Sequence, residues 1–311
     1  MNTLREQLDE YLAMRRALGF RLTELERQVG LFCTWLEARG QVRTFTIDDA
    51  VTWARLNPDA HRSWWATRLS LVRQFAAYLN ATGVDVPVIP TGLLTAKKSR
   101  AVPYIYSQED LDALLNSCSE EFTHERVAQT VRVVIGLLAC TGMRIGEALN
   151  LRVDDFDQIN AVLVIKAGKS DERLVPVHSS TMQVLTQYIA LPARAATHPD
   201  PHGAIFVSSK GTAYCYVSFF SLFKRVREAA GLKPRGRARP RIHDLRHSYA
   251  TLQMTTAYDN GGDPERVLSL LSTYLGHSDA AHTYWYLSAT SELMALAASK
   301  LDPTDNEGKL P

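Results

Sequence analysis

The sequence predicts a mainly α-helical protein of two domains with one small antiparallel β-hairpin. Apolar residues recur every three or four positions along most of the chain, which is the period of a helix with one buried face. Several of these stretches begin at a Ser or Thr with an acidic residue three positions later, as helix starts often do. At 311 residues the chain exceeds the usual size of one domain, so two cores are expected.

The composition is that of an ordinary globular protein. Hydrophobic residues make up 46% and charged residues 22%, and no apolar run is long enough to span a bilayer, which excludes a helical membrane protein. The first residues alternate in charge and lack the apolar core of a signal peptide, so a cytoplasmic protein is expected. Because no Cys-x-x-Cys pair is present, reduced structural thiols are expected at Cys33, Cys118, Cys140 and Cys215.

The first domain is expected to be a helical bundle over residues 1–83. Thr23 with Glu26, and Thr46 with Asp49, have the spacing of capping boxes. Helices are expected near residues 4–19 and 23–40, from residue 46, and over 63–79. Three arginines on the polar side of the fourth helix are candidates for phosphate contact, although a solvated face explains them equally well: Arg62, Arg68 and Arg73.

A linker is expected over residues 84–104. Prolines suppress helix in this segment, and its end is basic. The basic residues that extend the set of phosphate candidates are Lys97, Lys98 and Arg100.

The second domain is expected over residues 105–301, before a polar tail at 302–311. Ser107 with Asp110 caps its first helix, and a buried helix ends at Thr141-Gly142. Further helices are expected from residue 144, over 218–231 and over 264–276. Between residues 161 and 177, β-branched residues on either side of a turn predict a hairpin with Lys169 at its tip.

A short stretch near residue 245 carries the strongest chemical signal. His243 and Arg246 stand three residues apart, so both project from one face if the segment is helical. The segment from residue 224 to residue 246 contains nine Lys or Arg residues and only two acidic residues, which predicts a phosphate-rich partner. The arginines that alternate before the histidine are Arg235, Arg237, Arg239 and Arg241. Taken alone, His243 could cap a core helix while Arg246 pairs with an acid.

Other residues complete a set suited to phosphodiester chemistry. Arg144 opens a helix with Glu147 one turn on, where the carboxylate can hold the guanidinium in place. Two arginines suit the charge that builds on nonbridging oxygens, because the planar guanidinium donates two parallel hydrogen bonds and stays charged. Lys169 on a turn could protonate a leaving oxygen, although an exposed turn lysine is the plainer interpretation. No metal-ligand spacing is present, so neither a metal nor a cofactor is expected.

From residue 103 onward the sequence closely resembles the tyrosine recombinases, also called the phage integrase family. Four motifs carry the resemblance: Thr-Gly-Met-Arg-Ile-Gly-Glu-Ala-Leu at 141–149, Ala-Gly-Lys-Ser-Asp-Glu-Arg-Leu-Val-Pro at 167–176, His-Asp-Leu-Arg-His-Ser at 243–248 and Leu-Gly-His-Ser at 275–278. The hairpin motif departs from the commoner Gly-Lys-Gly-x-Lys, and the arginine-rich run is unusually long. Neither departure removes a catalytic group.

The resemblance implies a role for each site residue. Tyr286 would be the nucleophile, because it follows His277 by nine residues, and Tyr284 is its nearby competitor. Arg144, Arg246 and His277 would bind the scissile phosphate. Lys169 would protonate the leaving 5′-oxygen, and His243 would assist proton transfer from the tyrosine. The product would be a 3′-phosphotyrosine link.

The resemblance also implies the fold and the partners. It implies a helical, SAM-like core-binding domain and a mostly helical catalytic domain with a small antiparallel sheet, which together clamp double-stranded DNA as a tetramer. An apolar stripe of Leu293, Leu296 and Leu301 would pack either on its own domain or on a neighbouring protomer. A second recombinase or accessory protein remains an open alternative for the partner. So do two other functions: relaxation of DNA, as by a type IB topoisomerase, and DNA binding by a regulator without catalysis.

Overall fold

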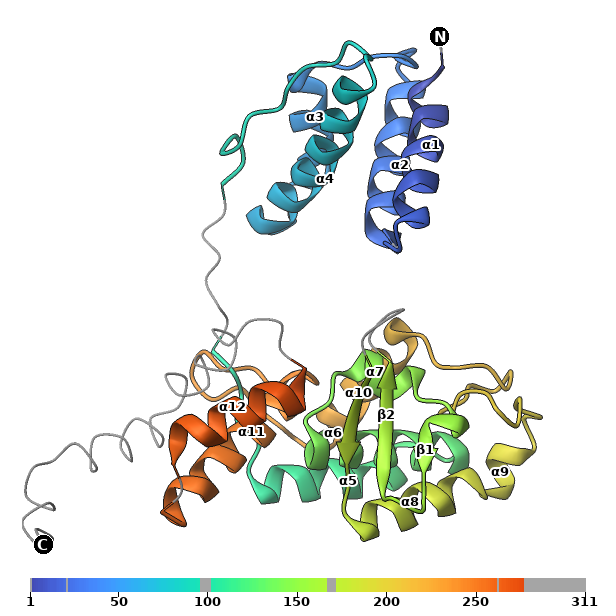
Figure 1. Cartoon of the computed structure of the whole chain (residues 1–311), viewed down its shortest axis with the longest axis vertical. Coiled ribbons are helices and arrows are strands. Elements are labelled where there is room, and N and C mark those ends of the chain that lie inside the picture. Colours follow the sequence, from blue (N-terminus) through green and yellow to red (C-terminus); the bar gives the residue numbers. More distant parts are fainter. Residues whose placement is uncertain (1, 21, 96–101, 167–171, 262, 277–311) are drawn as a thin grey trace, which may run out of the picture. The chain divides into compact units, whose positions relative to one another are not determined.

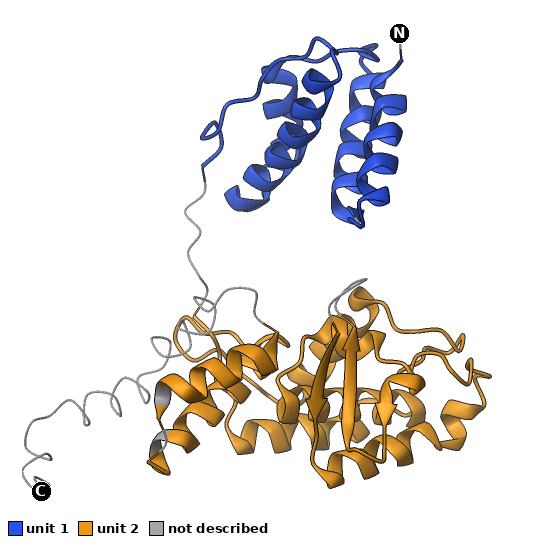
Figure 2. Cartoon of the chain, viewed as in Figure 1, with its two compact units in different colours: residues 1–100 blue, residues 101–311 orange. Residues whose placement is uncertain are grey.

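The computed structural model describes residues 2–20, 22–95, 102–166, 172–261 and 263–276. The chain forms two compact units, Met1–Arg100 and Ala101–Pro311, which Figure 1 shows by element and Figure 2 by unit. Each unit has its own cluster of buried apolar side chains. None of the helices in the described part of the chain has both the length and the apolar character needed to cross a bilayer.

The first unit is a bundle of four helices. They are α1 (Leu4–Ala17), α2 (Thr23–Glu37), α3 (Ile47–Ala54) and α4 (Arg62–Ala81). Phe32 of α2 and Phe75 of α4 are fully buried in the common core. Val86 and Ile89 are buried in the same core, so this part of the segment expected to be a linker packs on the first unit.

The helix starts test the predicted capping boxes. At Thr46 and at Ser107 the side chain accepts a hydrogen bond from the amide three residues on, and the carboxylate at that position accepts one from the backbone amide of the Thr or Ser, which confirms both boxes. The box predicted at Thr23 is wrong. Thr23 is already the first residue of α2, and Leu22 before it takes a left-handed conformation with φ of 49° and makes no side-chain cap.

The second unit is mostly helical. Its helices are α5 (Gln108–Glu121), α6 (Glu125–Thr141), α7 (Ile145–Asn150), a 3₁₀ turn η1 (Val153–Asp155), α8 (Ser179–Ile189), α9 (Pro192–Ala195), α10 (Tyr216–Ala229), α11 (Asp244–Asp259) and α12 (Pro264–Leu275). Helices α8 and α9 were not predicted from the sequence, and α10 begins two residues before the predicted start at residue 218.

A three-stranded antiparallel sheet lies in the second unit, in the order β1 (Phe156–Asp157), β2 (Val162–Lys166) and β3 (Glu172–Pro176). Leu163 pairs with Val175 across β2 and β3, and both side chains are buried. The predicted hairpin is therefore confirmed, with β1 as an additional strand. The mainly helical fold class with a small antiparallel sheet is confirmed as well.

Helix α6 organises the second unit. Its buried residues include Val131, Val134 and Leu138, and it packs against α5, α8 and α11. It ends at Gly142 as predicted, where the backbone is left-handed. Helices α11 and α12 lie side by side and share a small core of their own (Figure 1). The chain after α6, the start of α11 and the end of α12 thereby meet in one place.

Candidate active site

Arg246 connects three segments of the second unit. Its side chain is buried, and Nη1 donates a hydrogen bond to the carbonyl of Gly142 at 2.9 Å. Nη2 donates to the carbonyl of Leu275 at 2.7 Å. The guanidinium on α11 thus holds together the end of α6 and the end of α12.

The backbone at Gly142 requires glycine on two grounds. Its φ of +62° lies in the left-handed region, and an added Cβ would come within 2.5 Å of Tyr249 Cδ1. The turn at Gly142 leads directly from α6 to Arg144. The predicted Thr141-Gly142 boundary is therefore also the element that brings the first arginine of the site to its place.

Arg144 and Glu147 form the predicted pair at the start of α7. Arg144 Nη1 lies 2.9 Å from Glu147 Oε1, and the Arg144 amide donates to Oε2 at 2.8 Å. The other terminal nitrogen, Nη2, donates to the carbonyl of Gly276 at 3.0 Å. Because 42% of the Arg144 side chain is exposed, this guanidinium can still be reached from solvent.

Arg173 on β3, which is not among the predicted site residues, joins the same network. It pairs with Glu147 through both terminal nitrogens, at 2.9 Å to Oε1 and 2.7 Å to Oε2. Its Nε donates to the carbonyl of Tyr274 at 3.0 Å. One signal in the sequence could have identified it. Arg173 shares a strand face with the buried Val175, and an arginine on a buried face needs an acidic partner.

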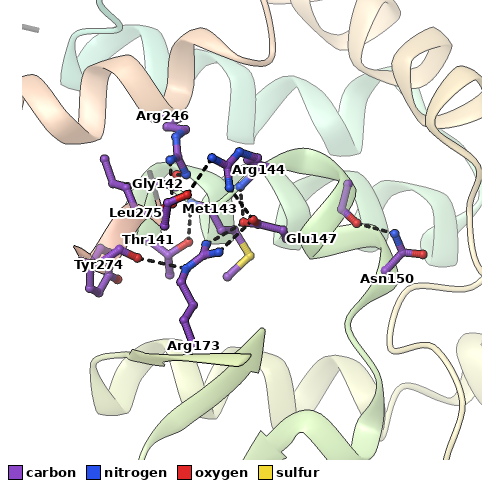
Figure 3. A network of polar contacts seen from close by, with 12 residues as sticks. Thr141, Gly142, Met143, Arg144, Glu147, Asn150, Arg173, Arg246, Tyr274 and Leu275 are labelled. Carbon is purple, nitrogen blue, oxygen red and sulfur yellow. Dashed lines mark hydrogen bonds and ion pairs between the residues drawn. The ribbon is translucent and has the colours of Figure 1, made fainter. Parts of the chain in front are cut away.

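Three arginines therefore converge on the last carbonyls of α12. Arg173, Arg246 and Arg144 donate to the carbonyls of Tyr274, Leu275 and Gly276 in that order. Figure 3 shows Arg144 and Arg173 at the Glu147 carboxylate, with Arg246 beside Gly142 and Leu275. The last carbonyls of a helix have no intrahelical partner and carry the negative end of the helix dipole, so cationic donors stabilise them. The arrangement concentrates positive charge where α12 ends.

Two histidines lie near Arg246, His243 just before the start of α11 and His247 on α11 itself. The rings of His243 and His247 meet edge to face, with centroids 5.0 Å apart. Burial of the His243 ring, and after it the positive charge of Arg246, lowers the pKa of His243, although the residue keeps contact with solvent. A neutral imidazole at pH 7 is suited to accept a proton.

The remaining predicted catalytic residues lie outside the described residues. These are Lys169, His277 and Tyr286, together with the competitor Tyr284. The structure brings together Arg144, Glu147 and Arg246, and it places His243 next to Arg246. In the described part of the chain, no group of three or more His, Cys, Asp or Glu residues is placed to hold a metal ion.

The phosphate candidates of the first unit differ in accessibility. Arg62 is exposed at the start of α4, but Arg68 is buried, with its guanidinium 3.8 Å from the centre of the Trp53 ring. The expectation that Arg68 lies on a polar face is therefore corrected. Arg73 donates to the carbonyls of Ile89 and Pro90, which ties the segment after α4 to the bundle. The candidates Lys97, Lys98 and Arg100 lie outside the described residues.

The arginine-rich run also divides into two kinds of residue. Arg235 pairs with Asp110, and Arg241 pairs with the fully buried Asp244 at the start of α11. Arg237 and Arg239 are exposed, and the described residues offer them no hydrogen bond or ion pair. These two side chains remain accessible to a phosphate.

Comparison with known proteins identifies relatives along nearly the whole chain. The model of the phage integrase family matches residues 105–292. The putative integrase/recombinase y4rB of Sinorhizobium fredii is 38% identical over 97% of this chain and 98% of its own length. The tyrosine recombinase XerD of Corynebacterium glutamicum is 28% identical over 91% of this chain and 92% of its own.

Solved structures share the fold at lower identity. The Tn1549 transposon integrase in complex with transposon right end DNA superposes with a TM-score of 0.62 at 19% identity, covering 96% of this chain and 99% of that chain. A λ integrase dimer bound to a core site superposes with a TM-score of 0.58 at 16% identity. The superposition covers 89% of this chain and 96% of that chain.

Replacement of Glu147 by Gln tests the electrostatics of the site. Burial raises the pKa of Glu147, but the hydrogen bonds from Arg173 and from the Arg144 amide outweigh burial and hold the pKa at about 2. The folded-state pKa lies below the ordinary glutamate value of 4.5, so the carboxylate stabilises the fold fully above pH 4.5 and loses this effect as pH falls toward 2. At pH 7 Glu147→Gln should lower the free energy of unfolding by about 3 kcal/mol.

The measurement is urea unfolding of both proteins at pH 7 and pH 3.5, with Glu172→Gln as a control at an exposed position on β3, next to Arg173. The difference in the free energy of unfolding between wild type and Glu147→Gln should be smaller at pH 3.5 than at pH 7 by about 1 kcal/mol. If the two free energies of unfolding are equal at pH 7, or differ by the same amount at both pH values, the Glu147 carboxylate does not stabilise the fold through a lowered pKa.

Proposed function

The chain belongs to the phage integrase family, and from this we propose that it is a site-specific DNA recombinase that acts through a 3′-phosphotyrosine intermediate. It cleaves DNA strands and rejoins them to new partners. Relatives across nearly its whole length carry the names integrase and tyrosine recombinase, which favours strand exchange over simple relaxation of one duplex. The element or chromosome that carries its target site is a separate question.

The observation that carries the proposal is the meeting of Arg144 and Arg246 at the end of α12. The two residues come from separate motifs, yet their guanidinium groups donate to the adjacent carbonyls of Gly276 and Leu275. Positioned donors stabilise charge as it develops on a transferring phosphoryl group, and a guanidinium does so without losing its proton. Both arginines are therefore proposed as ligands of the scissile phosphate, and His277, which follows Gly276, is proposed as the third.

Proton transfer completes the proposed reaction. The Tyr286 oxygen attacks phosphorus, its proton passes to neutral His243, and the bond to the 5′-oxygen breaks as Lys169 supplies a proton. The phosphotyrosine keeps the energy of the phosphodiester. A 5′-hydroxyl from another strand can therefore attack it and reseal the backbone without ATP.

We assign DNA contacts on the same basis. The helical first unit is proposed as the core-binding domain over residues 1–83 and the second as the catalytic domain over residues 105–301. The exposed cations proposed to meet phosphates are Arg62, Lys97, Lys98, Arg100, Arg237 and Arg239. Such a protein would work where DNA is present, in the cytoplasm.

Self-association on DNA is the other proposed partnership. The stripe of Leu293, Leu296 and Leu301 must be buried somewhere, and docking on a neighbouring protomer would join four chains on two duplexes. A second recombinase in the same assembly is compatible with this arrangement.

Tyr286→Phe tests the proposed nucleophile. On a nicked suicide substrate that carries the target site, this variant should bind DNA as wild type does and form no covalent adduct, because only the attacking oxygen is removed. Tyr284→Phe is the matched control and should form adduct. The measurement is denaturing gel electrophoresis of the protein–DNA adduct. If Tyr286→Phe forms the adduct and Tyr284→Phe does not, the nucleophile is Tyr284 and the proposed role of Tyr286 is wrong.

Arg237→Gln and Arg239→Gln test the proposed phosphate contacts. Each substitution should reduce the slope of log Kobs against the logarithm of the salt concentration by roughly 0.9. That is the change expected when one phosphate contact, and the counterion release that accompanies it, is lost. Arg235→Gln is the control, because Arg235 already pairs with Asp110 and should leave the slope unchanged. The measurement is DNA affinity by fluorescence anisotropy over a salt series. Equal slopes for wild type and both variants exclude contact of these residues with phosphate.

A further inference from the structure

We propose that Arg173 is a positioning residue for strand cleavage, one that orients Arg144 and the end of α12 toward the scissile phosphate. This inference rests on the proposed recombinase function. It assigns a role to a strand residue outside the predicted catalytic set. Arg173 would act through other residues and would not itself contact the phosphate.

Arg173 acts on Arg144 through the Glu147 carboxylate. This carboxylate holds the Arg144 guanidinium with Oε1 and the Arg144 amide with Oε2. The same two oxygens accept from Arg173 Nη1 and Nη2. A two-point ion pair fixes the plane of the carboxylate, which a single contact does not. The orientation of Arg144 therefore depends on Arg173.

Arg173 also contacts the end of α12. Arg173 Nε donates to the Tyr274 carbonyl, and a Cβ on Gly276 would lie 2.9 Å from Arg173 Nη1 and 3.2 Å from its Cδ. The Arg173 side chain therefore packs directly against the turn that ends α12. Gly276 is also the residue whose carbonyl accepts from Arg144. The same side chain thus supports Arg144 from two directions.

Arg173 and Arg144 differ in how far the protein already surrounds their guanidinium groups. Each of the three guanidinium nitrogens of Arg173 donates to the protein, and only 15% of its side chain is exposed. Arg144 is exposed to 42% and remains accessible to a ligand. Arg173 is thus occupied by the scaffold, whereas Arg144 is available to substrate. Lysine at position 173 would keep the charge but would lose the fork that makes three contacts at once.

The test compares Arg173→Lys with Arg194→Lys. Arg194 is a matched control, because its buried side chain also donates through three nitrogens, in this case to the carbonyls of Ile189, Ala204 and Ile205. The rate of covalent adduct formation is measured at saturating DNA on two suicide substrates. One has the ordinary scissile phosphodiester, and the other has a methylphosphonate there, which lacks the negative charge that Arg144 is proposed to neutralise.

If Arg173 positions Arg144, Arg173→Lys should slow cleavage of the ordinary substrate by about 10-fold or more, since small misplacements of a reacting group carry large rate losses. On the methylphosphonate its rate relative to wild type should recover substantially, because the charge that needs Arg144 is gone. Arg194→Lys should show the same relative rate on both substrates. Circular dichroism and DNA affinity establish folding and binding for each variant.

Three results would overturn the inference. Wild-type rates for Arg173→Lys, or an equal defect on both substrates, exclude a positioning role while leaving the recombinase function intact. If Arg173→Lys does not fold, Arg173→Gln, which keeps one N–H donor near the position of Nε but loses both terminal nitrogens and the charge, is read by the same criterion. Failure of wild type itself to form adduct on its target site refutes the recombinase function, and the inference with it.

Discussion

The sharing of one buried carboxylate by two guanidinium groups is the interaction on which the site depends. Glu147 lies between Arg144 and Arg173, and its two oxygens accept hydrogen bonds from both. A buried carboxylate is costly to desolvate, and removal of one partner would leave the remaining charges uncompensated. Because α7, β3 and α12 are all tied to this group, the local fold and the orientation of Arg144 are set by one network.

Much of the fold follows from local sequence signals. Helix periodicity, the capping boxes at Thr46 and Ser107 and the glycine stop at Gly142 were all predicted and are confirmed. Local signals failed where a neighbouring residue changed the geometry, as at Thr23, where Leu22 adopts a left-handed conformation. Helices α8 and α9 were missed. The burial of Arg68 was missed because it depends on Trp53 of a different helix, a tertiary contact that spacing along α4 does not report.

The candidate site was predictable as a set of residues but not as a network. The pairing of Arg144 with Glu147 follows from their spacing on one helix, and the structure contains it. The contacts that bring Arg246 to Gly142 and Leu275 join residues 104 and 29 positions apart, and no local pattern encodes them. The strand face of Arg173 indicates that its side chain needs a partner, but no local pattern identifies the partners, since they lie on α7 and α12. The roles of Arg246 and Arg173 become visible only when the path of the backbone in the folded chain is known.

The most direct test of this account is a crystal structure of the Tyr286→Phe protein bound to its target DNA. The account predicts that Arg144 and Arg246 lie within hydrogen-bond distance of the nonbridging oxygens of the scissile phosphate. It also predicts that Arg173 stays on Glu147 and on the Tyr274 carbonyl, as in the structure without DNA. A scissile phosphate bound away from both arginines, or Arg173 released from Glu147 to contact the phosphate itself, would contradict it.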